Sequence, residues 1–191
     1  MNFLAHIYLS GENDDVKFGN FIGDFVKGKK YKKYRDDIKK GILLHREIDS
    51  YTDKHPIVHK SIERMRPAYG KYAGVVIDIL YDHFLAKNWE QYSSEKLENF
   101  VIDFNYLVLE RLGKIPRKAR AFAFPFLRKK RLLCYANLTC FEEVLQKMAI
   151  YTSMPNYSKE AMKIINKNYN LFEDEFTNFF KDLQEHVKEF V

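Results

Sequence analysis

Acidic and histidine side chains occur in this sequence where an apolar helix face is expected. His45 and Asp49 are four residues apart, so on a helix their Cβ atoms lie about 5–6 Å apart on one face. Asp78 and Asp82 repeat this spacing inside a strongly apolar segment, and Asp24 also has apolar neighbours. A buried carboxylate without a partner costs several kcal/mol, so each must meet a cation, a donor or water.

One shared divalent cation would account for several of these residues at once. Taken singly, each has an ordinary explanation: Asp49 could cap a neighbouring helix, and Asp78 could pair with Arg46. His6, in the short apolar segment at the start of the chain, could be a hydrogen-bonded core histidine. Ion pairing alone does not explain why several helices carry Asp or His on an inward face. Mixed imidazole and carboxylate ligands suit Mn, Fe, Mg or Zn.

Other catalytic chemistries lack their motifs in this chain. The sequence has no GxSxG, no glycine-rich phosphate loop and no HExxH. Cys134 and Cys140 have neither a nearby histidine nor CxxC spacing, and two cysteines are too few for a disulfide framework. These cysteines suit a reducing cytosol.

The charge is positive and unevenly distributed. The 191 residues contain 32 Lys and Arg against 26 Asp and Glu, a net charge of +6. Residues 111–141 hold nine Lys or Arg and no acid, and residues 27–40 hold eight more. A single charge run is usually solvated surface. An acid-free stretch with interleaved aromatic residues instead indicates a docking surface for an anionic partner, which could be nucleic acid, anionic lipid or an acidic protein.

The apolar spacing is helical almost throughout, and alternating strand patterns are absent. We therefore expect one all-α domain over residues 1–191, a bundle of about seven to nine helices. After the short segment around His6, the expected helices are about 14–27, one from 36 or 37, 56–70, 75–89, 94–113, 139–153 and one long helix from 158 to the end. With no signal-peptide pattern and no apolar run of membrane-spanning length, we expect a cytoplasmic protein without stable membrane insertion.

Four ordered motifs resemble the acyl carrier protein phosphodiesterases, clearly over residues 1 to about 90 and weakly beyond. The motifs are Met1-Asn2-Phe3-Leu4-Ala5-His6, Gly19-Asn20-x-x-x-Asp24-Phe25-Val26-x-Gly28, Gly41-Ile42-x-x-His45-Arg46-x-Ile48-Asp49-x-x-Thr52-Asp53 and Asp78-x-x-x-Asp82-His83-Phe84-Leu85. The resemblance implies an all-α fold related to the HD-domain phosphohydrolases. The His-Asp dipeptide of those enzymes is missing, and Asp82-His83 has the reverse order, as it does in the resembled family.

The resemblance implies a divalent metal, typically Mn²⁺ with Mg²⁺ or Fe²⁺ as alternatives. The reaction it implies is hydrolysis of the phosphodiester that joins 4′-phosphopantetheine to a serine of holo-acyl carrier protein. On this basis the expected metal ligands are drawn from Asp24, His45, Asp49, Asp82 and His83. The expected catalytic residues are His6 or His83 as general acid and Arg46 as a balance for transition-state charge, with Asn20, Asp53 and Asp78 as an outer shell.

Acyl carrier proteins are acidic, which agrees with the positive charge, so we expect this partner rather than nucleic acid. The residues expected to dock it are Lys29, Lys30, Arg117, Lys118, Arg120, Arg128, Lys129, Lys130 and Arg131. Two alternatives stay open. One is an HD-like hydrolase of a nucleotide or another small phosphoester, and the other is a non-enzymatic basic helical module. The oligomeric state is open as well.

Overall fold

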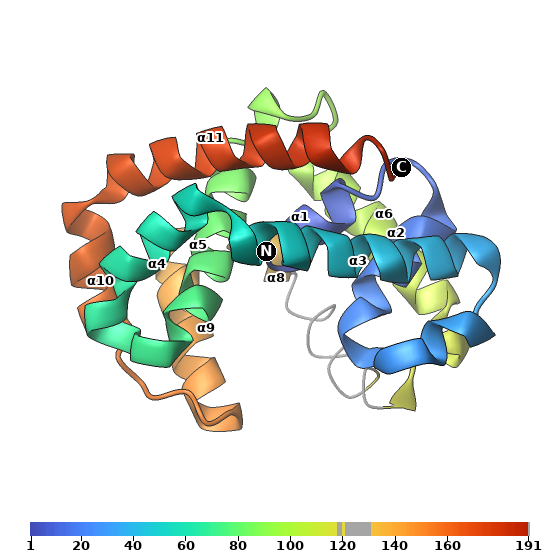
Figure 1. The fold of residues 1–191 in the computed structure, drawn as a ribbon, viewed down its shortest axis with the longest axis horizontal. Helices are drawn as coiled ribbons and strands as arrows, with labels where there is room; N and C mark the ends of the chain where they lie inside the picture. The colour runs from blue at the N-terminus through green and yellow to red at the C-terminus, as the bar shows by residue number, and fades with distance from the viewer. Residues whose placement is uncertain (118–119, 121–130, 191) are drawn as a thin grey trace.

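The computed structural model describes residues 1–117, 120 and 131–190, and this part of the chain is helical without strands (Figure 1). The all-α prediction is therefore confirmed. The α-helices are α1 (Phe3–Tyr8), α2 (Asp14–Ile22), α3 (Asp36–Lys54), α4 (Pro56–Tyr69), α5 (Ala73–Lys87), α6 (Leu97–Glu110), α8 (Arg131–Cys134), α9 (Leu138–Tyr151), α10 (Ser158–Lys167) and α11 (Tyr169–Val187). Short 3-10 segments join them at η1 (Gly23–Phe25), η2 (Gly28–Lys33), η3 (Gly70–Tyr72), η4 (Trp89–Gln91) and η5 (Leu112–Lys114).

The described residues form ten α-helices, more than the seven to nine expected. The predicted last helix is in fact two, because Asn168 interrupts it with a non-helical backbone and donates its side-chain amide to Ile164 O. The predicted helix from 14 to 27 ends at Ile22 and continues only as the 3-10 turn η1. Asn13 caps its start, accepting from two backbone N–H groups. Helical periodicity cannot reveal such interruptions, because apolar spacing continues across them.

Helix α11 runs beside α3 along the long axis of the molecule (Figure 1). Helices α9 and α10 lie at one end of this axis, and α2 and α6 lie toward the other (Figure 1). Among the described helices, none combines the length and the apolar character needed to cross a membrane.

Two glycines let α2 and α3 pack with their backbones almost in contact. A Cβ atom on Gly19 would lie 2.1 Å from Ile38 O, and one on Gly41 would lie 2.1 Å from Val16 O. Any larger residue would push the helices apart. This close packing places Asn20 of α2 against Gly41 of α3, and Gly41 lies one helical turn before His45.

Cys134 of α8 and Cys140 of α9 form a disulfide in the structure, with Cα atoms 5.7 Å apart. The sequence had suggested reduced cysteines without a disulfide role, so this part of the interpretation is corrected. The six-residue separation falls at the turn between two helices, which brings the two Cα atoms within the range that a disulfide spans.

Candidate metal centre

Two histidines and two carboxylates from three separate elements meet at one point. Nε2 of His6, on α1, lies 3.2 Å from Asp49 Oδ1, and Nε2 of His45, on α3, lies 3.2 Å from Asp49 Oδ2. Asp24, on η1, places its Oδ1 3.4 Å from the same His45 nitrogen. His6, His45 and Asp49 form a group whose ligand atoms all lie within 4.8 Å of one another. The structure therefore brings together three of the predicted ligands, and adds His6.

Both histidines are buried, while both carboxylates reach solvent. His6 and His45 are 3% and 5% exposed, and their rings stack with centroids 4.2 Å apart. The side chains of Asp49 and Asp24 are 42% and 55% exposed. The group is thus buried on the histidine side and open on the carboxylate side, where a substrate could approach.

Asn20 of α2 lies behind the two rings and is fully buried. Its Oδ1 is 2.9 Å from Nδ1 of His6 and 3.2 Å from Nδ1 of His45. The second ring nitrogen of each histidine is therefore the one directed at the carboxylates. Asn20, for which an outer-shell role is predicted, therefore contacts both histidine rings on the side away from the carboxylates.

The directions of the pKa shifts agree with a positive charge between these groups. Burial lowers the pKa of His6 to about 4, and the positive charge of the neighbouring His45 acts in the same direction. Burial would also lower the pKa of His45. The hydrogen bonds to Asp24 and Asp49 and the negative charges of these two residues outweigh burial and raise that pKa to about 9. The pKa of Asp49 lies well below its usual range: burial would raise it, and the two histidines more than reverse that effect. Near neutral pH the protein thus places a proton on His45 against two negative charges.

The donor atoms of this group could also hold a divalent cation. The Nε2 atom of His45 is buried and has no hydrogen bond of good geometry, although Asp24 and Asp49 lie close by. A cation accepts ligands over a wider range of directions than one N–H bond, so it would use all three groups together. Two carboxylates and a +2 ion with neutral histidines also sum to zero charge. Such nitrogen and oxygen donors suit Mn²⁺ and related ions.

A close approach of η1 to α3 holds Asp24 at this site. A Cβ atom on Gly23 would lie 2.4 Å from Cγ of His45, so only glycine lets the η1 backbone pass this close to the ring. The signal was present in the sequence as the glycine that precedes Asp24, although nothing there showed which residue it faces.

Asp82 is not a ligand of this centre, which corrects the prediction. Its two oxygens accept from the backbone N–H groups of Leu4, at 2.7 Å, and Ala5, at 3.1 Å, at the start of α1. It acts as an N-terminal cap supplied by another helix. Asp78, expected in the outer shell, binds the Met1 amino group at 3.0 Å instead of Arg46.

His83 and Arg46 also lie outside the centre, contrary to the predictions. Nδ1 of His83 bonds the carbonyl of Tyr135 and Nε2 bonds the hydroxyl of Tyr169, each at 2.8 Å. It projects from a different side of α5 than Asp82, because adjacent residues on a helix are about 100° apart. Arg46 donates to Val26 O at 2.7 Å and to Gly28 O at 2.8 Å, so it secures the segment between η1 and η2.

The predicted outer-shell and docking residues are placed only in part. Asp53 is exposed one turn beyond Asp49 on α3, and within the described residues no hydrogen bond connects it to the centre. Lys29 and Lys30 are exposed on η2, and Arg117 is exposed as well. Arg120 is exposed and donates to Gly113 O and Ile115 O. The docking predictions for Lys118, Arg128, Lys129, Lys130 and the side chain of Arg131 fall outside the described residues.

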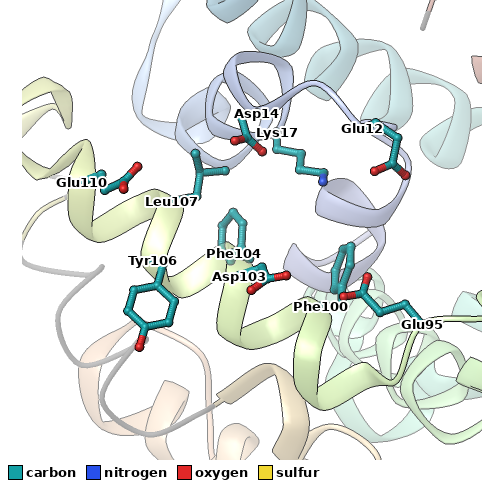
Figure 2. Close-up of a pocket in the computed structure, with 10 residues that line it drawn as sticks. All are labelled: Glu12, Asp14, Lys17, Glu95, Phe100, Asp103, Phe104, Tyr106, Leu107 and Glu110. Atoms are coloured by element: carbon teal, nitrogen blue, oxygen red, sulfur yellow. The ribbon is translucent and has the colours of Figure 1, made fainter.

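A cavity of about 470 Å³ lies elsewhere, between α6 and the start of α2 with the segment that precedes it (Figure 2). It contains no residue of the candidate metal centre. Its charged lining is mostly acidic, and consists of Glu12, Asp14, Glu95, Asp103, Glu110 and Lys17. Such a lining repels a phosphodiester, so the candidate metal centre, whose two carboxylates reach solvent, is the better candidate for chemistry on phosphate.

Comparisons with known proteins agree with the motifs. The chain matches the family described as acyl carrier protein phosphodiesterase over residues 1–183. A protein of that description from Pectobacterium atrosepticum is 28% identical over 189 residues, which cover 98% of each chain. Others from Yersinia pestis and from Enterobacter sp. (strain 638) are each 30% identical, over 94% and 98% of both chains. No solved structure matches, so the likeness to HD-domain enzymes stays a prediction.

Proposed function

Because the chain belongs to the acyl carrier protein phosphodiesterase family and is therefore a phosphodiester hydrolase, we propose that it is metal-dependent and releases 4′-phosphopantetheine from holo-acyl carrier protein. One observation carries the proposed metal dependence. His6, His45, Asp49 and Asp24 converge on one point, and there the buried Nε2 atom of His45 has no hydrogen bond of good geometry.

The four side chains have different roles in the site. When bound, a divalent cation neutralises charge on the phosphodiester oxygens and lowers the pKa of a water molecule. Asp49 contacts both histidines, so it joins the α1 and α3 parts of the centre. Asp24 is the most exposed of the four and lies at the side open to substrate. The buried rings of His6 and His45 exclude water from the opposite side.

The basic segment η2 supports docking of an acidic carrier protein next to this centre. It follows η1, which carries Asp24, and its lysines are exposed. The two hydrogen bonds from Arg46 hold the start of η2 against α3, one residue from His45. Complementary charges of this kind guide an encounter and fix its orientation. A carrier protein bound at η2 would therefore present its modified serine close to Asp24.

The proposed reaction is tested by mass spectrometry of the carrier protein. Incubation of holo-acyl carrier protein with the enzyme and Mn²⁺ should remove about 340 Da, the mass of the phosphopantetheine group that hydrolysis releases. The same mixture with EDTA should show no loss. An unchanged carrier protein beside turnover of a nucleotide would favour the small-phosphoester alternative and overturn the proposal.

Replacing Gly23 by alanine should weaken Mn²⁺ binding at least about tenfold, with a matching loss of activity at low Mn²⁺. The new Cβ atom would meet the His45 ring at 2.4 Å, so either the ring or η1 with Asp24 must move. Calorimetric titration with Mn²⁺ measures the change. Gly74→Ala is the matched control, because its Cβ atom would meet only Ile62 Cδ1 at 3.7 Å. Unchanged Mn²⁺ affinity in folded Gly23→Ala would contradict the placement of Asp24.

Reversing charge at Lys29 and Lys30 should lower kcat/KM for holo-acyl carrier protein about tenfold at low salt and flatten its salt dependence, with little change in kcat. The same reversal at Lys159 and Lys163 of α10 is the control, because these exposed lysines lie on a helix at the other end of the molecule from η2 (Figure 1). Equal losses in both variants would point to a general charge effect and count against docking at η2.

A further inference from the structure

We infer that Asn20 is a positioning residue that sets the same proton arrangement on both histidines, so that each presents Nε2 to the metal. The inference rests on the metal centre of the proposed function. It adds to that centre a residue that selects the tautomer of both histidines. Its basis is the set of contacts made by one fully buried amide.

The orientation of the Asn20 amide is fixed by its other partners. Nδ2 donates to the carbonyl oxygen of His6 at 2.8 Å and to Oγ of Ser10 at 2.9 Å. A backbone carbonyl can only accept. In the reversed amide, the side-chain oxygen would face that carbonyl with no proton between them. The hydroxyl of Ser10 donates to the same carbonyl at 2.8 Å, and it would have to give up that bond to donate to a reversed amide.

Because the nitrogen of the amide faces His6 O, its oxygen must face the two rings. Oδ1 is an acceptor and lies 2.9 Å from Nδ1 of His6 and 3.2 Å from Nδ1 of His45. Each Nδ1 atom makes this contact as a hydrogen bond only when it carries a proton. A neutral ring then has its lone pair on Nε2, and both Nε2 atoms point at Asp49.

This arrangement leaves His6 Nε2 among acceptors only. It lies 3.2 Å from Asp49 Oδ1 and 3.2 Å from the carbonyl oxygen of Met1. With the ring proton held at Nδ1 by Asn20, a cation is the species that makes these contacts favourable. One side chain thus orients the rings of helices α1 and α3 together, which is why its loss should affect both ligands at once.

The test measures Mn²⁺ affinity by calorimetry in three variants. Asn20→Ala should weaken binding about 10–100-fold, the usual effect of losing a residue that orients metal ligands. Asn20→Asp keeps an acceptor for both Nδ1 atoms but loses both Nδ2 donations, so its affinity should lie between those of Asn20→Ala and the parent protein. Ser61→Ala is the control for loss of a buried polar group, because Ser61 is equally buried and bonds Tyr81 and Glu175 instead. Folded Asn20→Ala with parent affinity would overturn the inference.

A second measurement needs no metal and no variant. Long-range ¹H–¹⁵N correlation spectra of the metal-free protein at neutral pH should show the ring proton of His6 on Nδ1. A proton on Nε2 would overturn the role of Asn20, whether or not metal binds. If the parent protein binds no Mn²⁺, Mg²⁺ or Fe²⁺, the metal proposal fails, and these spectra still decide the role of Asn20.

Discussion

Replacing Asp49 by alanine should abolish hydrolysis of holo-acyl carrier protein, with kcat/KM falling about 10³-fold or more. Asp49 is the one member of the centre that contacts both histidines, through a different oxygen for each. Its removal separates the α1 and α3 halves and deletes a negative charge next to His45. Loss of a bound metal removes several kcal/mol of transition-state stabilisation, and about 4 kcal/mol corresponds to roughly 10³-fold in rate.

Two measurements separate this effect from a folding defect. Metal analysis of the purified Asp49→Ala protein should find the metal lost, while its circular dichroism stays helical. Asp53→Ala is the matched control: it removes an exposed carboxylate one turn further along α3 and should keep metal and activity within about twofold. Full activity in folded Asp49→Ala would sink the metal proposal, and equal losses in both variants would mean that the negative charge of this face matters rather than the contacts.

The sequence predicted the fold class and the half of the site that lies on one helix. His45 and Asp49 are four residues apart, and helical geometry alone then places them on one face. Asp24 could be proposed as a ligand from the sequence, but its position next to His45 could not be predicted. Its approach to His45 depends on the glycine contacts between α2 and α3 and on Gly23, and a sequence shows that a residue is small without showing what it faces.

The errors concern residues whose partners are backbone groups. Asp82 is predicted as a ligand because a buried carboxylate needs a partner and because of the family resemblance, and His83 because of the resemblance alone. The partners of Asp82 are N–H groups of α1, and one partner of His83 is the carbonyl of Tyr135. Backbone groups are present at every residue, so no sequence pattern identifies the ones that a side chain meets. The role of Asn20 rests on such a contact too, with the carbonyl of His6.

Asp82 should make the stability of the protein depend on pH. Burial raises the pKa of Asp82 to about 7, and the N–H groups of Leu4 and Ala5 offset this only in part. The folded protein therefore holds this proton more tightly than the unfolded chain, whose aspartates titrate near pH 3.9. Below about pH 3.9 the protonated carboxyl group makes its whole contribution to the free energy of unfolding. This contribution is lost as the pH rises through the folded-state pKa of about 7.

Denaturant unfolding in EDTA measures this effect. The difference in unfolding free energy between the parent protein and Asp82→Asn should change with pH. An asparagine cannot ionise, so from pH 5 to pH 7 the parent should lose about 2–3 kcal/mol of unfolding free energy relative to the variant, since each pKa unit is worth 1.36 kcal/mol. Above pH 8 the difference should level off. Asp53→Asn, which removes an exposed carboxylate, should show no such trend. A difference that stays constant from pH 5 to pH 8 would mean that the α1 N–H groups keep Asp82 ionised throughout, and Asp82 would then be a fully compensated cap.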